Sequence, residues 1–124
     1  MTTKLLEPLT NAIIYEDSKV YACLATFPIV KGRTIVAWKK STSDLHLLSK
    51  ADYEYLMDKV DEVRNALLKT LKVTKVYLLY MDEVKQVHWH LVPRYNEKGF
   101  GIFQHTPSGL TDFSLVRRIK KNLL

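Results

Sequence analysis

The chain has 124 residues, the size of one ordinary domain, and its hydrophobic content of 47% is enough for a core and argues against disorder. No stretch has the length of a membrane span or the pattern of a signal peptide, and a single cysteine, Cys23, excludes an internal disulfide. The formal net charge of +6 admits anionic partners such as nucleotides, phosphorylated metabolites or nucleic acid. We therefore expect one cytoplasmic domain over residues 1–124, without membrane contact and with Cys23 buried.

Two runs near the N-terminus have the β-branched, aromatic and apolar residues of strands. They cover residues 12–17 and 20–26, and a turn-like triplet, 17–19, separates them, so the sequence predicts a β-hairpin. A loop with Pro28 and Gly32 follows. We expect a third strand over the next apolar run, 33–39.

The hydrophobic period changes at Ser49. Ser49 and Asp52 form a start signal of the capping-box type, and apolar residues then recur at spacings of three and four. The pattern predicts an amphipathic helix from about residue 50 to residue 71, long enough to cover most of a sheet.

The second half of the chain predicts further strands and one more helix. Residues 73–81 are almost continuously apolar, as expected for a central strand, and residues 86–95 form the next strand. A short strand is expected at 98–103 and a final helix at 111–124, capped by Thr111. The inner face of this helix should carry Phe113, Val116, Ile119 and Leu123. Because most strand connections are short, we expect the α+β class: an antiparallel sheet of about five strands with one long helix and a C-terminal helix.

The strand at residues 86–95 carries an unusual polar stripe. Alternate side chains of a strand share a face, so Gln86, His88 and His90 should point one way. The opposite face should pack on the helix through Val87, Trp89 and Leu91. Pro93 is expected to end the strand pairing, with Arg94 at the end of the strand.

Three interpretations of the two histidines compete. They lie on a solvent-facing side without a role, or they bind a metal, or one of them is a nucleophile. Zinc requires three or four ligands, and only His88 and His90 converge, so we expect no metal. A neutral imidazole can attack phosphorus through one ring nitrogen when a carbonyl holds the proton of the other. A second donor two residues away can then stabilise the phosphoryl oxygens or the leaving group.

Residues 86–95 resemble the signature of the histidine triad (HIT) superfamily, His-x-His-x-His with apolar residues between, often followed by Pro-Arg. The hairpin, the glycine-containing entry to the third strand and the long helix extend the resemblance over roughly residues 13–95. It implies a homodimeric α+β protein without a cofactor that hydrolyses or transfers nucleotidyl groups. Such substrates are dinucleoside polyphosphates, nucleoside phosphoramidates and adenylylated molecules.

The register of the motif implies the role of each residue. His88 corresponds to the nucleophile that carries the nucleotide covalently, and His90 to the histidine that contacts phosphate or leaving group. Gln86 replaces the first histidine, and its carbonyl can still orient His88. The candidate phosphate contacts are Arg33, Lys85 and Arg94, of which Arg94 is equally well explained as a structural cap.

Several positions depart from the family pattern. Ala25 stands where many members have an acidic residue that holds the ribose, with Asp17 or Thr26 as possible replacements, and Arg33 stands where many have histidine. These departures leave open an alternative function, a catalytically silent nucleotide-binding or interaction module. A weaker third alternative is nucleic-acid binding through the basic residues of the last helix, Arg117, Arg118, Lys120 and Lys121, which are otherwise explained as a solvated helix face.

Overall fold

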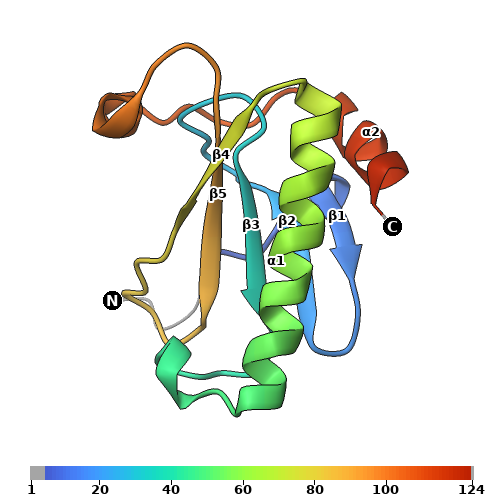
Figure 1. The fold of residues 1–124 in the computed structure, drawn as a ribbon, viewed down its shortest axis with the longest axis vertical. Helices are drawn as coiled ribbons and strands as arrows, with labels where there is room; N and C mark the ends of the chain where they lie inside the picture. Colours follow the sequence, from blue (N-terminus) through green and yellow to red (C-terminus); the bar gives the residue numbers. More distant parts are fainter. Residues whose placement is uncertain (1–4, 124) are drawn as a thin grey trace.

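The computed structural model describes residues 5–123 and contains a five-stranded antiparallel sheet with two α-helices on one face (Figure 1). The strands are β1 Ile13–Glu16, β2 Val20–Leu24, β3 Thr34–Trp38, β4 Lys75–Leu79 and β5 His88–Arg94. Their order across the sheet is β1-β2-β3-β5-β4. The helices are α1 Lys50–Leu71 and α2 Ser114–Asn122, and three 3₁₀-helices are η1 Thr10–Ala12, η2 Leu45–Leu47 and η3 Gly99–Gln104. The predicted fold class is therefore confirmed.

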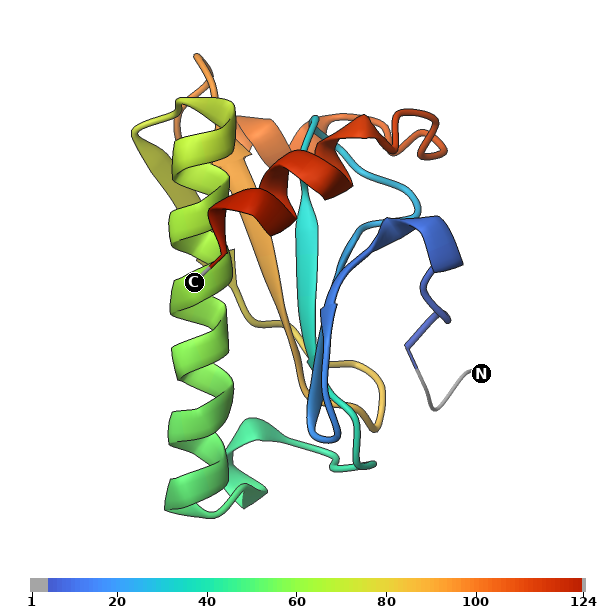
Figure 2. The same cartoon turned by 90° about the vertical axis from the view of Figure 1, so that its right-hand side faces the viewer.

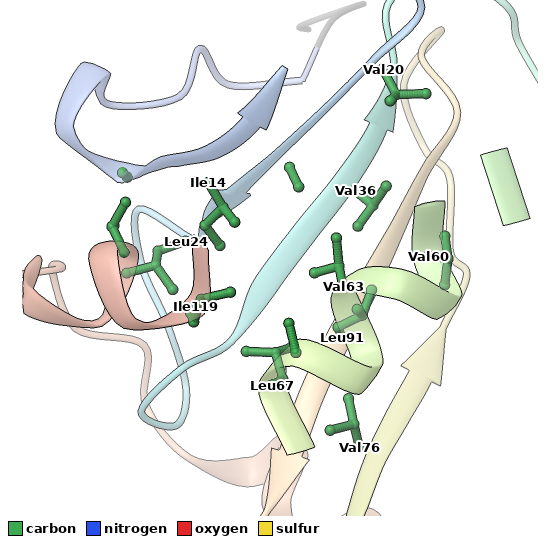
Figure 3. Close-up of a cluster of buried hydrophobic side chains, with 14 of the residues drawn as sticks. Ile14, Val20, Leu24, Val36, Val60, Val63, Leu67, Val76, Leu91 and Ile119 are labelled. Carbon is green, nitrogen blue, oxygen red and sulfur yellow. The ribbon is translucent and has the colours of Figure 1, made fainter. Parts of the chain in front are cut away.

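The two faces of the sheet are covered differently. Figure 2 shows α1 on one side of the sheet and the N-terminal segment before β1 on the other. A large apolar core lies between the sheet and both helices, and the labelled side chains of Figure 3 come from β1, β2, β3, β4, β5, α1 and α2. A smaller cluster of Tyr21, Cys23 and Ala37, with Leu5 and Ile35 against it, lies on the opposite face. Cys23 is buried there, as predicted. No helix within residues 5–123 is long and apolar enough to cross a membrane.

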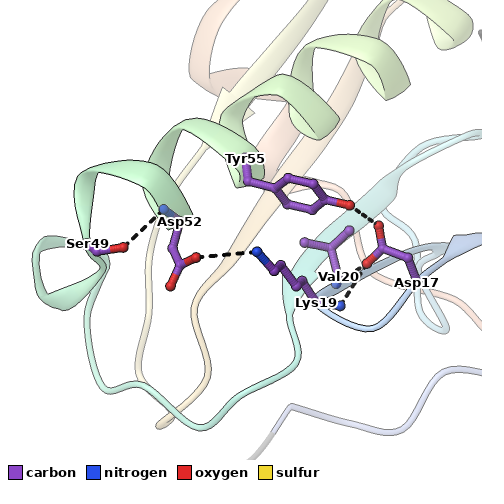
Figure 4. Close-up of polar contacts among 6 residues, drawn as sticks. All are labelled: Asp17, Lys19, Val20, Ser49, Asp52 and Tyr55. Carbon is purple, nitrogen blue, oxygen red and sulfur yellow. Dashed lines mark hydrogen bonds and ion pairs between the residues drawn. The ribbon is translucent and has the colours of Figure 1, made fainter.

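Helix α1 begins and ends where the sequence predicts. The Ser49 hydroxyl accepts a hydrogen bond from the backbone N–H of Asp52 at 3.1 Å, which satisfies one of the free donors of the first turn (Figure 4). At the other end Lys72 adopts the left-handed conformation that often terminates helices, with φ of 55°. Arg118 of α2 donates to the carbonyl of Thr70 at 3.1 Å, so part of the basic charge of α2 satisfies the end of α1.

The hairpin turn between β1 and β2 is tied to α1 by one carboxylate. Asp17 accepts backbone hydrogen bonds from Lys19 and Val20, both at 2.8 Å, and a hydroxyl hydrogen bond from Tyr55 (Figure 4). The hydroxyl of Tyr15 also donates to Asp17, at 2.8 Å. Partial burial opposes the charged form, but these donors together hold the pKa of Asp17 well below its usual value. The hairpin is therefore anchored to the helix at neutral pH.

Four expectations about individual elements were wrong. Strand β4 lies at the edge of the sheet instead of in its centre, because β5 is inserted between β3 and β4. Val76 is the one buried residue of β4 and Leu78 is 41% exposed, so the apolar run does not mark a central strand. Residues 98–103 do not form a strand, since η3 occupies most of them.

The other two corrections concern ends of elements. Pairing continues through Pro93, which faces Val76 of β4, because β3 no longer flanks β5 there and the missing N–H is tolerated on a free edge. Helix α2 begins at Ser114, where Asp112 rather than Thr111 accepts the hydrogen bond from the first backbone N–H. Its buried residues are Leu115, Val116 and Ile119.

The fold predicts that Leu67→Ala is strongly destabilising. The Leu67 side chain is fully buried between α1 and the sheet, so truncation should leave a cavity and lower the free energy of unfolding by about 2–5 kcal/mol. Urea denaturation measures this change. Leu47→Ala is the matched control, because Leu47 is 57% exposed and should change stability by no more than about 0.5 kcal/mol. Equal effects of the two variants would contradict this description of the core.

Candidate active site

The register of the sheet places both histidines on the face away from the helices. Cys23 of β2 pairs with Ile35 of β3, and Ile35 pairs with His90 of β5. Two residues further along the strands, Ala37 pairs with His88. Because paired residues of neighbouring strands point to the same side, the histidines share the face of the smaller cluster. Val87 and Leu91 lie in the large core on the other side and Trp89 packs against it, as the alternation predicts.

The proton of His88 is placed by a backbone carbonyl. His88 Nδ1 lies 2.8 Å from the carbonyl oxygen of Gln86, and a carbonyl oxygen only accepts hydrogen bonds. Nδ1 must therefore carry a proton, and in the neutral ring the lone pair is on Nε2. Gln86 thus supplies through its backbone the orienting contact expected from the sequence.

The ring proton of His90 lies on Nε2, whereas that of His88 lies on Nδ1. Arg33 Nη2 lies 2.8 Å from His90 Nδ1, and a guanidinium only donates, so Nδ1 must accept and the ring proton is on Nε2. Burial, then the charge of Arg33 and the proximity of His88, lower the pKa of His90 to about 4. The two rings are 4.9 Å apart between centroids and nearly perpendicular, at 78°. With both rings neutral, the site therefore places a lone pair on His88 Nε2 beside a donor on His90 Nε2.

Arg33 is a half-buried cation without an acidic partner. No carboxylate of residues 5–123 lies within 4.0 Å of its guanidinium, and its Nε atom is buried without any hydrogen-bond partner. Burial lowers the pKa of the Arg33 guanidinium, which measures the cost of removing this charge from water. An anion bound beside His90 would offset that cost.

The backbone before Arg33 is held in a special conformation. Gly32 has a φ of +85°, and a Cβ atom there would lie 2.7 Å from Cδ1 of Leu71, the last residue of α1. The hydroxyl of Tyr95 donates to the carbonyl of Lys31 at 2.6 Å. The position of Arg33 therefore depends on the end of α1 and on the residue that follows β5.

The side chain of Gln86 holds two other segments together. Its Nε2 donates to the carbonyl of Trp38 at 3.2 Å, and its Oε1 accepts from the backbone N–H of Leu5 at 3.3 Å. The amide thus ties the N-terminal segment to the end of β3. An ionised carboxylate in place of this amide could not make both contacts, because it has no donor for the carbonyl of Trp38.

Arg33 and His90 separate two hollows on this face, and both residues line both of them. The β2 hollow, about 220 Å³, has a floor from β2 and β3, and the N-terminal segment forms one wall. Its other lining residues are Leu5, Leu6, Pro8, Tyr21, Cys23, Ala25, Thr26, Phe27 and Ile35. The β4 hollow, about 190 Å³, is otherwise lined by Ile29, Leu79, Val92 and Phe103.

The β2 hollow contains no carboxylate among its described lining residues. Ala25 lies in its wall, where the resemblance led us to expect an acidic residue in many relatives. Asp17 does not line the hollow and is bound to the hairpin turn instead, so it does not replace the missing acid. Thr26 does line the hollow.

The remaining predicted phosphate contacts lie elsewhere. Lys85 has an exposed side chain, and its carbonyl accepts from Ser41. Arg94 donates to Thr74 at 3.3 Å, next to the start of β4, which agrees with a structural cap. Neither residue lines either hollow. Within residues 5–123 no three His, Cys, Asp or Glu side chains are grouped so as to hold a metal ion.

Sequence reasoning missed most of the apolar residues that line the two hollows, of which three are instructive. Leu5 and Tyr21 line the β2 hollow, and Phe103 lines the β4 hollow. Tyr21 had a usable signal, because it alternates with Cys23 and Ala25 on the face opposite to Ala22 and Leu24. Leu5 and Phe103 had none, since both lie outside the strands that carry the motif.

An antiparallel sheet with this helix order and two histidines on its open face defines a class of small α+β proteins. Within it, the HIT domain family matches residues 8–97, and the chain belongs to this family. A HIT-like protein of Mesomycoplasma hyorhinis is 33% identical over 97 residues, which is 73% of this chain and 86% of the relative. Adenosine 5′-monophosphoramidase of Saccharomyces cerevisiae is 28% identical over 117 residues, 90% of this chain and 71% of the relative. The crystal structure of a Hit-like protein from Bartonella henselae superimposes with a TM-score of 0.76 at 20% identity, over 93% of this chain and 88% of that one.

The contact of Arg33 with His90 predicts the protonation of His90. At pH 6 the ring should be neutral, with its proton on Nε2, because its pKa is about 4 and Nδ1 accepts from Arg33. Nitrogen-15 NMR of the imidazole measures both. In Arg33→Ala the pKa should rise, since a nearby cation is removed, whereas Arg94→Ala should leave it unchanged. A charged His90 at pH 6 in the unaltered protein would contradict the site geometry.

Proposed function

We propose that the protein is a nucleotidyl hydrolase or transferase that breaks a phosphoanhydride or phosphoramidate bond through a covalent intermediate on His88. The observation that carries this proposal is the opposite placement of the two ring protons, by the Gln86 carbonyl and by Arg33. A nucleophile and a neutral donor are thereby held side by side on one strand. The relative that is an adenosine 5′-monophosphoramidase supports the same class of substrate.

The proposed first step is attack of His88 Nε2 on phosphorus. The bond from phosphorus to the leaving group breaks, and its electron pair leaves with that group, which takes a proton from solvent. The ring of His88 becomes positively charged, and the hydrogen bond from Nδ1–H to the Gln86 carbonyl strengthens as that charge develops. Arg33 and the Nε2–H of His90 face the charge on the phosphoryl oxygens.

The proposed second step returns the histidine to its starting state. Water attacks the phosphorus bound to His88 and releases a proton to solvent, the phosphorus–nitrogen bond breaks, and its electron pair returns to Nε2. The product is a nucleoside monophosphate, and the reaction consumes one water. An alcohol or phosphate in place of water would make the same step a transfer.

One observation favours the alternative of a catalytically silent nucleotide-binding module. His88 is only 4% exposed and lines neither hollow, so phosphorus could reach Nε2 only after a small movement of the surrounding side chains. Binding without chemistry needs only Arg33, His90 and the β2 hollow. A homodimer stays a prediction under either function.

A covalent intermediate predicts an adduct on one named atom. Mixing the protein with an adenosine 5′-phosphoramidate should give a transient adenylylated protein, located on His88 by mass spectrometry. His88→Ala should abolish the adduct and lower turnover by roughly a thousandfold or more, and His90→Ala should lower turnover by about a hundredfold.

The matched control is His46→Ala, because the His46 side chain is 76% exposed and lies on η2. Circular dichroism should show that each variant is folded. An unchanged rate in folded His88→Ala would exclude the covalent mechanism, and binding of AMP without any turnover would leave the silent module as the function.

The absence of a carboxylate in the β2 hollow predicts weak discrimination against deoxyribose. A carboxylate that accepts from the two ribose hydroxyls contributes about 1.5–3 kcal/mol per hydrogen bond, and Ala25 cannot accept any. AMP and dAMP should therefore bind with similar affinity, as calorimetry would measure. Ala25→Asp should create a preference for AMP, and Ala25→Asn provides the uncharged control. A preference of about a hundredfold in the unaltered protein would show that another group, with Thr26 the first candidate, holds the ribose.

A further inference from the structure

The β4 hollow differs in chemistry from the hollow on the other side of Arg33 and His90. Apart from that pair, its walls are four apolar side chains, Ile29, Leu79, Val92 and Phe103. No further charged or hydrogen-bonding side chain within the described residues lines it. A phosphate or carboxylate that entered it would lose water without gaining a partner beyond Arg33 and His90, whereas an apolar group would be stabilised by burial.

The position of this hollow relates it to the reacting phosphorus. His90 pairs with Ile35 on one side and with Leu79 on the other, so the β2 and β4 hollows lie on opposite sides of the same residue. On the proposed function, a nucleotide whose phosphoryl group contacts Arg33 and His90 and whose nucleoside occupies the β2 hollow would have the β4 hollow free for its other phosphorus substituent.

The outer wall of the β4 hollow comes from a part of the chain beyond the matched family region. Phe103 belongs to η3, and the family match ends at residue 97. Tyr77 of β4 holds this segment in place, because its hydroxyl accepts from the backbone N–H of Gly99 at 2.9 Å and its ring lies 6.4 Å from that of Phe103. Of the four apolar wall residues, Phe103 alone lies beyond the matched region, so its place in the wall does not follow from the family match.

We propose that the β4 hollow is the subsite for the leaving group, that it selects an apolar group, and that Phe103 is the residue that determines this selectivity. The proposal rests on the proposed function and narrows its substrates. Nucleoside monophosphates joined to a small aliphatic or aromatic group should be preferred over dinucleoside polyphosphates, whose second half is charged. With an amine as leaving group, attack by His88 breaks the phosphorus–nitrogen bond, the electron pair stays on nitrogen, and nitrogen takes a proton from solvent.

Two isosteric substrates test the selectivity directly. The AMP phosphoramidates of 3-methylbutylamine and of β-alanine have leaving groups of the same shape, one ending in two methyl groups and the other in a carboxylate. We expect kcat/KM to favour the 3-methylbutylamine compound by about tenfold or more. Phe103→Ser should reduce this ratio, and Phe103→Lys should reverse it by adding a cation beside the carboxylate.

The control variant is Phe100→Ala. Phe100 belongs to the same 3₁₀-helix but is 86% exposed and does not line the β4 hollow, so the ratio should stay unchanged. Equal rates for the two substrates in the unaltered protein, or a preference for the β-alanine compound, would overturn the proposal. It would also be overturned if Phe103→Ser changed only the elution volume of the protein, since the hollow would then be a contact between two copies.

The experiment distinguishes an incorrect assignment of the β4 hollow from an incorrect proposed function. If neither compound is hydrolysed, the proposed function fails, and the ratio of the two dissociation constants measured by calorimetry still reports on the hollow. Tighter binding of the apolar compound that is lost in Phe103→Ser would support the subsite in a silent protein. Equal binding of both compounds would exclude it.

Discussion

The hydrogen bond from Arg33 to His90 sets the chemistry of the open face of the sheet. It fixes the imidazole as a neutral acceptor at Nδ1 and a donor at Nε2, and it keeps a cation in a half-buried place that no described carboxylate neutralises. Such a cation is costly unless an anion accompanies it. The same two side chains also line both hollows, so the charge of this face and its division into two hollows depend on a single contact.

The opposite face of the sheet makes this arrangement possible. Leu91 and Val87 bury the reverse side of β5 against α1 and α2, and β5 lies between two neighbours in the sheet. A strand held in this way has little freedom to rotate, so the imidazoles of His88 and His90 keep their perpendicular packing. The apolar face thus supplies folding stability, while the other face holds a half-buried guanidinium next to a half-buried imidazole, an arrangement that lowers stability.

The sequence alone was sufficient to predict the helix at residues 50–71, the hairpin, and the side of β5 on which the histidines lie. Each of these is encoded by local periodicity or by a cap within one segment. The edge position of β4 could not be predicted, because strand order depends on which segments pair. Lys75–Leu79 is apolar enough for a central or an edge strand. Family resemblance placed Arg33 near the site, but its contact with His90 joins residues 57 positions apart and no local pattern encodes it.

The role of Gln86 shows a second limit of motif comparison. When only the motif is considered, glutamine in place of the first histidine suggests a loss of activity. In the folded chain the backbone carbonyl still orients His88, while the side-chain amide joins Leu5 to Trp38 and so closes one wall of the β2 hollow. A titratable imidazole is thereby replaced by an amide that stays neutral at every pH and joins two segments by hydrogen bonds. Only the three-dimensional contacts reveal this role.

Gly32 brings the loop before Arg33 into close contact with Leu71 at the end of α1. Its missing side chain leaves room for Leu71 at the last turn of α1, directly before the residue that holds His90. A bulkier side chain at position 71 would displace this loop and Arg33 with it, although position 71 ends a helix on the other face of the sheet. Sequence differences between relatives at this helix end are therefore expected to alter the contact between Arg33 and His90, as much as differences in the histidine strand itself.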